Sequence, residues 1–434
     1  MTCPEQNQAW NFRMNLRAAM CARVFTLAFV LSVAMTPAAQ AQTFQVLFNF
    51  PSYGGGFNPV GLAVDRAGNF YGAMEQGLFG GVFKFSRSGS GWIFTNLYRF
   101  QGDPDGSAPT GITVGPDGSL YGTTGTGGIG PCDRNTYYGC GTVFRLQPPA
   151  TGCKSVGCPW KVTSLYSFQG TPDLQYPESE VAFDQAGNLY GTATQGGAYG
   201  KGGVFHLVRS QSGWTYTILH SFSGSPDGDS PVTGVTIDSS GNMYGTTLAG
   251  GTGSGPNCGN YGCGTVYEVS PSGSGWSETI LYNFTESGAD GYPPYAALLL
   301  DPAGDLYGTT EAGGSTFGGT VFELSPTNGS FAFSLLYTLP AHNGDADFSQ
   351  SRLVMDKAGS LYGATSDGGY YGFGMVFKLS PGYGGWTFTD LHDFAGPDGY
   401  FPSGDLVLDA SGNLYGTALE GGSHNEGVIW EITP

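Results

Sequence analysis

Four charged side chains stand where the rest of the sequence repeats small or apolar residues, and they are its best candidates for chemistry. They fall at the start of the first segment of an internal repeat, where other copies carry valine or threonine. Three carboxylates beside one arginine could bind a cation, or could supply the acid and base of a glycan-cleaving hydrolase or lyase. The alternative is that they are solvated rim residues whose charges offset one another. These residues are Glu178, Glu180, Arg352 and Asp405.

A second candidate site consists of aromatic residues that precede glycine in corresponding loops of the repeat. Their rings could stack on sugar faces or on cations and so bind a ligand. Because the spacing is regular, they could instead be structural wedges that pack between neighbouring units. The last copy has His424-Asn425-Glu426 in place of the aromatic residue. The six aromatic residues are Phe79, Tyr138, Tyr199, Tyr261, Phe317 and Tyr371.

Signals for a metal or a nucleophile are weak. Asp103-Pro-Asp105-Gly106 is similar to a fragment of a calcium loop, but Pro-Asp-Gly is also an ordinary turn. We therefore expect no cofactor, with calcium as the alternative. The five histidines form no spaced pair with an acidic residue, and no G-x-S-x-G elbow occurs. His220 and His392 replace the tyrosine of a repeated Leu-Tyr pair, which favours a structural role.

The cysteines indicate disulfides. Six remain once the N-terminal leader is set aside, and an even number in an exported chain is typical of disulfide pairing. Their spacing is wider than that of zinc knuckles, and no histidine lies nearby, so zinc is the weaker interpretation. The predicted pairs are Cys132 with Cys140, Cys153 with Cys158, and Cys258 with Cys263.

The elements that must position these residues follow from a sevenfold repeat. Each copy has four segments rich in β-branched and aromatic residues, joined by tight turns such as Asp65-Arg-Ala-Gly68. Four short strands repeated in this way, without any helical pattern, predict an all-β fold, a seven-bladed β-propeller with four antiparallel strands per blade. A Tyr-Gly pair marks each copy, at Tyr71, Tyr121, Tyr190, Tyr244, Tyr307, Tyr362 and Tyr415.

The two ends of the repeat predict how the ring closes. Residues 44–50 match a fourth segment, whereas the chain ends after a third one. We therefore expect the N-terminal strand to complete the last blade and to lie beside residues 427–433. Antiparallel order also places the most variable loops on one face, where binding is expected.

The motif Asp-x-x-Gly-Asn-Leu-Tyr-Gly-Thr-Thr, followed by Gly-Gly, Gly-Thr-Val-Phe-x-Leu-Ser-Pro and Leu-Tyr-x-Phe, resembles the GloVer tandem repeat of Gloeobacter and Verrucomicrobia. The similarity spans residues 44–434. It implies an exported bacterial propeller from a family of undetermined biochemical role, and it implies no catalytic residues. Members of that family often carry a C-terminal anchoring domain, which we do not expect here.

The first 41 residues predict a signal peptide, which leaves a single propeller domain at 42–434. A basic stretch with Arg13, Arg17 and Arg23 precedes an apolar stretch at 24–33, and Ala39-Gln40-Ala41 fits a cleavage site. No second apolar run of spanning length follows. A secreted or periplasmic protein without a membrane span is expected, and we expect a monomer.

The charge balance excludes some partners. Cleavage removes three arginines and one glutamate, so 16 basic and 34 acidic residues become 13 and 33, a net charge of −20. Nucleic acids and anionic membrane surfaces are therefore poor partners.

These observations favour a non-enzymatic exported propeller that binds a glycan or a surface protein through its loop-rich face, with the six aromatic residues and Arg352 as contacts. One alternative is a glycan-active hydrolase or lyase that uses Glu178, Glu180 and Asp405. A structural envelope protein is the other. The fold itself does not choose among these functions.

Overall fold

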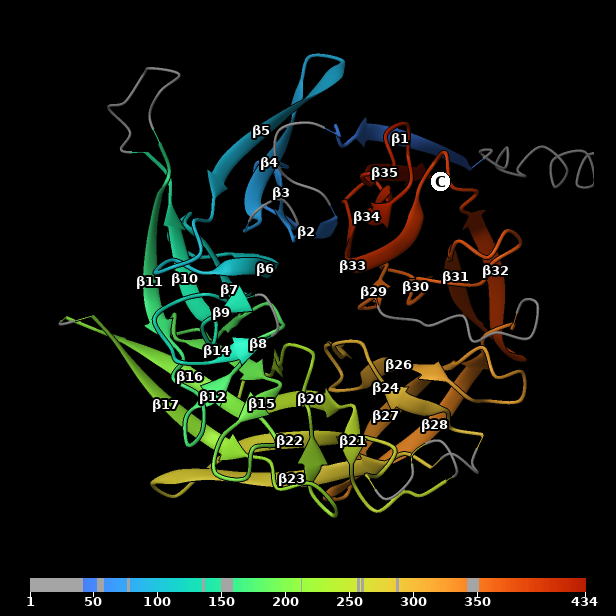
Figure 1. The fold of residues 1–434 in the computed structure, drawn as a ribbon. Helices are drawn as coiled ribbons and strands as arrows, with labels where there is room; N and C mark the ends of the chain where they lie inside the picture. The colour runs from blue at the N-terminus through green and yellow to red at the C-terminus, as the bar shows by residue number, and fades with distance from the viewer. Residues whose placement is uncertain are drawn as a thin grey trace, which may run out of the picture. The chain divides into compact units, whose positions relative to one another are not determined.

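The computed structural model describes residues 42–52, 58–75, 79–134, 137–149, 159–211, 213–255, 258, 261–285, 289–341 and 351–434. Residues 44–433 form one compact unit. In it, seven antiparallel sheets follow one another around a central channel (Figure 1). The described residues contain no helix, so none of them belongs to a helix that could cross a bilayer. The predicted seven-bladed, all-β architecture is confirmed.

Each blade runs from an inner strand at the channel to an outer strand at the rim. Blade 1 contains β2 (Pro59–Val64), β3 (Phe70–Met74), β4 (Gly81–Ser88) and β5 (Gly91–Arg99). Blade 2 contains β6 (Ser107–Val114), β7 (Leu120–Thr126), β10 (Thr142–Gln147) and β11 (Lys161–Ser167). Blade 3 contains β13 (Ala182–Phe183), β14 (Leu189–Ala193), β16 (Gly203–Ser210) and β17 (Gly213–Ser221). Blade 4 contains β19 (Thr236–Ile237), β20 (Met243–Thr247), β22 (Thr265–Ser272) and β23 (Gly275–Asn283).

The remaining blades follow the same order, and in blade 5 the inner strand is split in two. Blade 5 contains β24 (Tyr292–Pro294), β25 (Leu299–Leu300), β26 (Leu306–Ala312), β27 (Thr320–Thr327) and β28 (Ser330–Thr338). Blade 6 contains β29 (Val354–Met355), β30 (Leu361–Thr365), β31 (Met375–Gly382) and β32 (Gly385–Asp393). Blade 7 contains β33 (Tyr400–Leu408), β34 (Leu414–Glu420), β35 (Val428–Thr433) and β1 (Thr43–Asn49).

Blade 7 closes the ring as the sequence predicts. The N-terminal strand β1 pairs with β35, and the two lie side by side at the seam (Figure 1). The backbone N–H of Phe50 donates to the carbonyl of Gly427 at 3.1 Å, and Asn49 Oδ1 accepts from Ser423 N at 2.7 Å. Closure in this way leaves blade 7 with its full set of four strands.

The repeated Asp-x-x-Gly and Tyr-Gly motifs form one structural unit. In blade 1, Asp65 Oδ1 accepts hydrogen bonds from the backbone N–H groups of Ala67 and Asn69, which fixes the turn between β2 and β3. Its other oxygen, Oδ2, accepts from the Tyr71 hydroxyl at 3.0 Å. The same tyrosine-to-aspartate bond recurs in other blades, for example between Tyr190 and Asp184 at 3.1 Å. The motif therefore ties each turn to the second strand.

The glycine of Tyr-Gly is required because an aromatic ring of the neighbouring strand lies directly against its Cα atom. A Cβ atom at Gly72 would lie 2.4 Å from Cζ of Phe83, the aromatic residue of the neighbouring strand. Blade 6 repeats the arrangement with Gly363 and Phe377, at 2.5 Å. A large ring on the third strand thus packs directly over the backbone of the second strand.

The hydrophobic core lies between blades. Seven clusters of buried apolar side chains occur among the described residues, and each joins residues of two successive blades. One example packs Leu353 and Phe377 of blade 6 against Tyr307 and Val321 of blade 5. Burial of these faces holds the ring together and leaves the channel and the loops free to vary.

Candidate ligand-binding site

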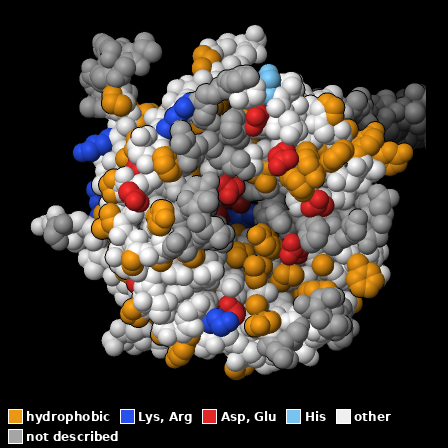
Figure 2. All heavy atoms as spheres, viewed as in Figure 1, with side chains coloured by type: hydrophobic (Ala, Val, Ile, Leu, Met, Phe, Trp, Pro, Cys, Tyr) orange, Lys and Arg blue, Asp and Glu red, His pale blue; other side chains and the backbone are white. Residues whose placement is uncertain are grey.

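A cavity of about 590 Å³ occupies one mouth of the channel. It is lined by the starts of inner strands and by residues at or just after the ends of second strands, so it opens on the face of the variable loops. The cavity brings together all four charged residues singled out in the sequence, Glu178, Glu180, Arg352 and Asp405. Acidic side chains surround the central hollow, with a basic side chain at its floor (Figure 2). Arg352 is the one basic residue among the described residues that line the cavity.

Glycines of neighbouring blades make room for two of these carboxylates. A Cβ atom at Gly234 would lie 2.9 Å from Oε1 of Glu180, and one at Gly111 would lie 3.0 Å from the Cβ atom of Glu180. A Cβ atom at Gly61 would lie 3.1 Å from the backbone nitrogen of Asp405. Small residues on blades 1, 2 and 4 thus allow acidic side chains to extend into the channel.

The environment of the cavity changes the acidity of its carboxyl groups. Burial in the channel wall and the charge of Asp405 raise the pKa of Glu180 to about 7, although Arg352 opposes the shift. Burial also raises the pKa of Asp405, again against the effect of Arg352. At neutral pH the pair therefore holds a proton for part of the time. Such groups are candidates for proton transfer.

Arg352 connects two blades that are not neighbours in the ring. Its Nη2 atom donates a hydrogen bond to Thr236 Oγ1, at 3.2 Å, from blade 6 to blade 4. Glu180, Arg352 and Asp405 also line a second cavity, of about 670 Å³, at the other end of the channel. Together with Leu62 and Ile112, which also line both cavities, these three side chains form the boundary between them.

Two further lining residues were missed in the sequence analysis. Glu75 follows the second strand of blade 1, and burial together with the charge of Glu178 raises its pKa. Tyr295 lies in blade 5, and its pKa is raised by burial and by nearby glutamates that include Glu178. Glu75 could have been found, because the residue four places after the Tyr-Gly tyrosine is neutral in most other copies. Tyr295 has no such signal, since it lies where the inner strand of blade 5 is interrupted.

The loop aromatics lie on the same face as this mouth but do not line the cavity, and five of the six are exposed rather than wedged between blades. Their exposed fractions range from 55% to 71%. Phe79 differs, because it packs against Gly102, where a Cβ atom would lie 2.9 Å from its ring. The wedge interpretation is thus wrong for the five exposed rings, which are Tyr138, Tyr199, Tyr261, Phe317 and Tyr371.

Disulfides tie down two of the exposed tyrosines. Cys132 and Cys140 are bonded and flank Tyr138, and the bonded pair Cys258 and Cys263 flanks Tyr261. Both predicted pairs are confirmed, and such bonds are typical of proteins outside the cytoplasm. The third predicted pair, Cys153 with Cys158, lies outside the described residues.

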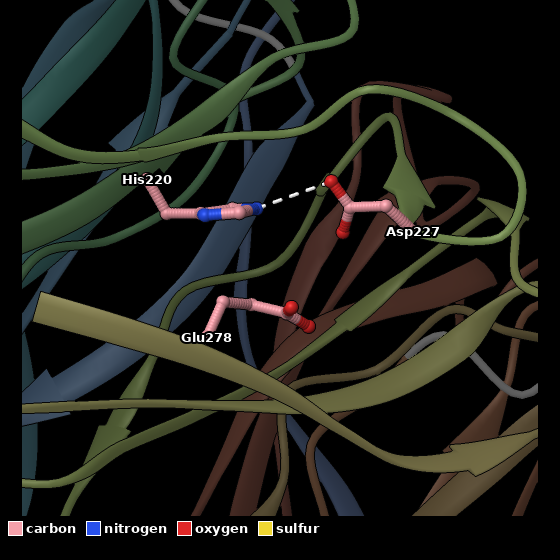
Figure 3. A group of neighbouring side chains, drawn as sticks. All are labelled: His220, Asp227 and Glu278. Atoms are coloured by element: carbon pink, nitrogen blue, oxygen red, sulfur yellow. Dashed lines mark hydrogen bonds and ion pairs between the residues drawn. The ribbon is translucent and has the colours of Figure 1, made fainter.

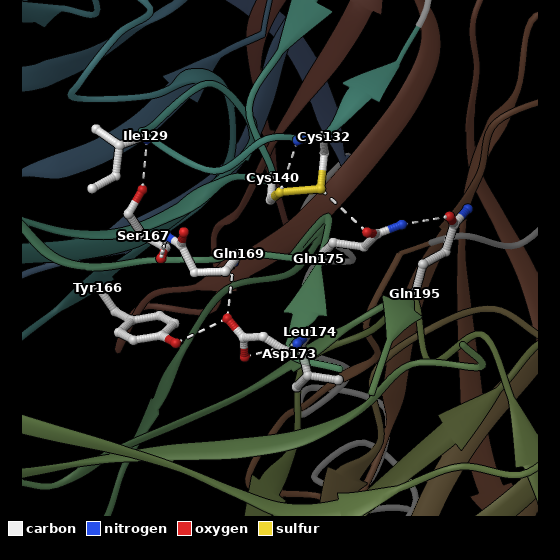
Figure 4. Close-up of a disulfide and its surroundings, with 10 residues drawn as sticks. All are labelled: Ile129, Cys132, Cys140, Tyr166, Ser167, Gln169, Asp173, Leu174, Gln175 and Gln195. Atoms are coloured by element: carbon white, nitrogen blue, oxygen red, sulfur yellow. Dashed lines mark hydrogen bonds between the residues drawn. A yellow bond between two sulfur atoms is a disulfide. The ribbon is translucent and has the colours of Figure 1, made fainter. Parts of the chain in front are cut away.

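The first disulfide also contacts the next blade (Figure 4). Cys132 Sγ lies 3.2 Å from Oε1 of Gln175, whose Nε2 donates to Gln195 Oε1 at 3.2 Å. Gln175 and Gln195 belong to the short paired strands β12 (Leu174–Gln175) and β15 (Gln195–Gly196). The disulfide loop of blade 2 is therefore supported by the loops of blade 3.

The aspartates of the Pro-Asp-Gly turns have a local role. Asp105 accepts hydrogen bonds from the Tyr98 hydroxyl and from the backbone N–H of Gln101. Asp290 accepts in the same way from Tyr282, at 3.0 Å. These contacts support the turn interpretation over calcium for Asp105. His220 and His392 occupy the tyrosine position of this contact, as expected from their place in the repeat.

One group of potential metal ligands was not foreseen. His220, Asp227 and Glu278 are the one set of three His, Cys, Asp or Glu residues in the described chain whose ligand atoms all lie within 4.8 Å of one another. Only the register between two blades brings Glu278 to the other two residues.

Comparisons with known proteins agree with the architecture. The model of the Gloeobacter/Verrucomicrobia repeat family matches residues 133–256 and 253–434. A search of curated proteins finds no match.

Solved structures share the fold at low identity. A catalytically inactive variant of virginiamycin B lyase from Staphylococcus aureus, solved with quinupristin, has a TM-score of 0.56 and 12% identity, covering 91% of this chain and 99% of that one. The extracellular domain of a putative hybrid two-component system from B. thetaiotaomicron has a TM-score of 0.54 and 11% identity, covering 89% of this chain and 39% of that one. At such identities the likeness concerns the fold alone.

Proposed function

The chain belongs to the Gloeobacter/Verrucomicrobia repeat family, and we propose that it is an exported, non-enzymatic β-propeller that binds a glycan at the loop-rich mouth of its channel. The supporting observation is that a cavity of about 590 Å³ and the exposed loop aromatics share one face. A volume of this size is within the range of small-ligand sites, roughly 300 to 1,000 Å³. The exposed aromatic rings provide flat apolar surfaces on the same face.

The negative charge of the cavity indicates which glycans it could bind. Glu75, Glu178, Glu180 and Asp405 outnumber Arg352, so the cavity is acidic. Carboxylates accept hydrogen bonds from sugar hydroxyls and attract amino groups, whereas they repel uronic and sialic acids. We therefore propose a neutral or amino sugar as the ligand. The rings favour the same choice, because aromatic faces bind apolar sugar faces and cations.

A glycan array with the mature chain, residues 42–434, tests this function. We expect binding to neutral or amino glycans and none to acidic ones. Glu178→Gln should weaken binding, because it removes one carboxylate from the cavity. Glu426→Gln is the matched control, since Glu426 lies in the loop between β34 and β35 of blade 7, on the same face, but does not line the cavity. Binding to acidic glycans alone would contradict the proposal, and no binding at all would favour a protein partner or a structural role.

The perturbed carboxyl pair supports a second candidate, a glycan-cleaving hydrolase or lyase. With its pKa raised to about 7 by burial and by the Asp405 charge, Glu180 is protonated in part of the molecules at neutral pH. A protonated carboxyl beside an ionised one is the arrangement that acid catalysis of glycoside cleavage requires. Product analysis of each bound glycan distinguishes the candidates. Cleavage that is lost in Glu180→Gln while binding persists would establish the enzyme.

A further inference from the structure

The outer strands of blades 3 and 4 meet at a group of three side chains, shown in Figure 3. His220 lies on β17, Glu278 on β23, and Asp227 in the loop that leads from blade 3 to blade 4. His220 Nε2 lies 3.2 Å from Asp227 Oδ2. The Glu278 carboxyl group points toward the same space (Figure 3), and one ligand atom from each residue lies within 4.8 Å of the others.

Most other junctions of the ring carry stacked aromatic rings at this place, although blade 2 has Val162 there. Tyr166 of blade 2 stacks on Tyr216 of blade 3, with centroids 3.8 Å apart, and Tyr282 of blade 4 stacks on Phe333 of blade 5, at 4.3 Å. Glu278 has the same register as these second partners, because it pairs with Val269 as Tyr216 pairs with Leu207. At the junction of blades 3 and 4, the carboxylate of Glu278 therefore takes the place of an aromatic ring that would pack between the two blades. Hydrophobic packing does not account for that substitution.

The junction between blades 6 and 7 is an internal control. It also has a histidine and an aspartate, with His392 Nε2 2.9 Å from Asp398 Oδ2. The third position there is Phe44, which stacks on His392 with ring centroids 3.5 Å apart. A histidine-aspartate pair is thus compatible with a ring at the third position. The carboxylate at Glu278 is an additional feature of blades 3 and 4.

Two polar atoms at this junction have no hydrogen-bond partner. Oε1 of Glu278 is buried without one, and so is the hydroxyl of Tyr267. Tyr267 is 0% exposed, its ring lies 5.0 Å from that of Phe222, and the Glu278 charge raises the pKa of its hydroxyl in addition to the effect of burial. Blades 1, 2, 3, 5 and 6 have phenylalanine at this place. Buried polar groups normally have partners, so the Glu278 oxygen points to a bound species, whereas the Tyr267 hydroxyl lies over Gly245 of the second strand.

We propose that His220, Asp227 and Glu278 bind a divalent transition-metal ion, preferably Zn²⁺. One imidazole nitrogen and two carboxylate oxygens match the ligand preference of zinc, whereas calcium and magnesium prefer oxygen alone. Three protein ligands leave a fourth position for water, which could reach the site because His220 and Asp227 are partly exposed.

Small side-chain movements bring the ligands to zinc distances. Ligand atoms of a tetrahedral site lie roughly 3.4 Å apart when the metal bonds are about 2.1 Å. The separation of His220 and Asp227 is already close to this value. Glu278 can supply the remaining movement by rotation about its side-chain bonds. Asp227 is held in place by the backbone N–H groups of Ser223 at 2.9 Å and Gly228 at 2.7 Å.

A metal at this site would join two blades. Its ligands come from the last strand of blade 3, the linking loop and the last strand of blade 4, so the ion would replace the missing aromatic stack. Because the ion would bind the folded protein and not the unfolded chain, its binding would stabilise the ring. This inference is independent of the proposed glycan site at the channel mouth.

Zinc titration of the chelator-treated mature chain tests the proposal, with Zn²⁺ itself as the probe. Calorimetry should give one saturable site per chain, and zinc should raise the melting temperature. Glu278→Gln should weaken zinc affinity by about tenfold or more, because it removes a charged ligand. The control His392→Gln changes the blade 6 pair and should bind zinc as the original protein does.

A second variant separates metal loss from misfolding. Glu278→Phe restores the ring found at other junctions, so it should fold, lose the zinc site and melt at the same temperature with and without zinc. The proposal is overturned if the original chain shows no saturable zinc binding, or if Glu278→Gln and Glu278→Phe bind zinc as tightly as it does.

Discussion

The two ends of the channel are built from the same inner strands, yet they have different chemistry. The loop-rich mouth has Glu75 and Glu178 in its wall, and Glu180, Arg352 and Asp405 lie where the two cavities meet. The rest of the opposite cavity is lined mainly by valine, isoleucine and leucine. The ends of the inner strands are constrained because their side chains pack between blades. The side chains at the starts of these strands do not have to pack between blades, so a charged residue can replace an apolar one there. Departures from a repeat therefore mark sites where packing no longer determines the residue.

The largest effect is expected at the packed end, from Leu353→Ala. Leu353 is 1% exposed and belongs to the cluster between blades 5 and 6. Removal of its side chain should lower the free energy of unfolding by about 3 kcal/mol, because it creates a cavity in a core with little freedom to collapse. Urea unfolding measures this loss. The folded variant should keep its glycan affinity, and a fall in affinity would show that the two ends are not independent.

The next effect is expected at the loops, from removal of a disulfide. Cys132→Ser combined with Cys140→Ser should lower stability by about 2 to 3 kcal/mol at most, because the bond closes a short loop. Hydrogen exchange should increase around Tyr138 and remain slow in the strands of blade 2. Mild reduction should likewise loosen the loops before the β-sheet signal is lost. Loss of the whole sheet signal on mild reduction would contradict the separation of loops from ring.

The parts that were predictable from the sequence are those that the repeat encodes. Strand number, ring closure by β1 and the meeting of Glu178, Glu180, Arg352 and Asp405 follow from aligning seven copies, since equivalent positions lie at equivalent places around an axis. The solvent exposure of side chains could not be predicted from the aligned copies. Regular spacing suggested wedges, whereas rings such as Tyr199 point into solvent.

Side-chain contacts between neighbouring blades could not be predicted from the sequence either. His220 and Glu278 meet because one outer strand packs on the next in a particular register. That register depends on the twist and spacing of the blades, which sequence periodicity alone does not supply. Comparison of the copies at this one position would have revealed that Glu278 replaces an aromatic residue, but not which side chains of blade 3 it meets.

Glu180→Gln should reduce the pH dependence of protein stability, because Glu180 is a titrating group of the channel. Burial and the Asp405 charge raise the pKa of Glu180 to about 7 from its ordinary value of 4.5, so between these pH values the folded state holds a proton that the unfolded state has lost. The resulting stability is present below pH 4.5 and is lost as pH rises through about 7. At pH 8 the variant should be more stable than the original chain by roughly 1.5 kcal/mol, with water in the channel limiting the effect.

Unfolding curves between pH 5 and pH 8 check this expectation. Glu426→Gln serves as the control, because that carboxyl group lies outside the cavity. Glu180→Gln should show a flatter pH profile than both the control and the original chain. Equal profiles for all three proteins would mean that Glu180 titrates as it does in the unfolded chain.

The smallest effect on the fold is expected from Tyr199→Ala, which isolates the loop face from the ring. Tyr199 is 65% exposed, so its removal should change stability by less than about 0.5 kcal/mol. Affinity for the glycan selected by the array should fall about fivefold, because one stacking surface is lost. Tyr383→Ala is the matched control, since Tyr383 is also exposed but lies in the turn between β31 and β32, on the opposite face. If both variants bound the glycan equally well, the loop aromatics would not be part of the site, and the acidic cavity alone would have to account for binding.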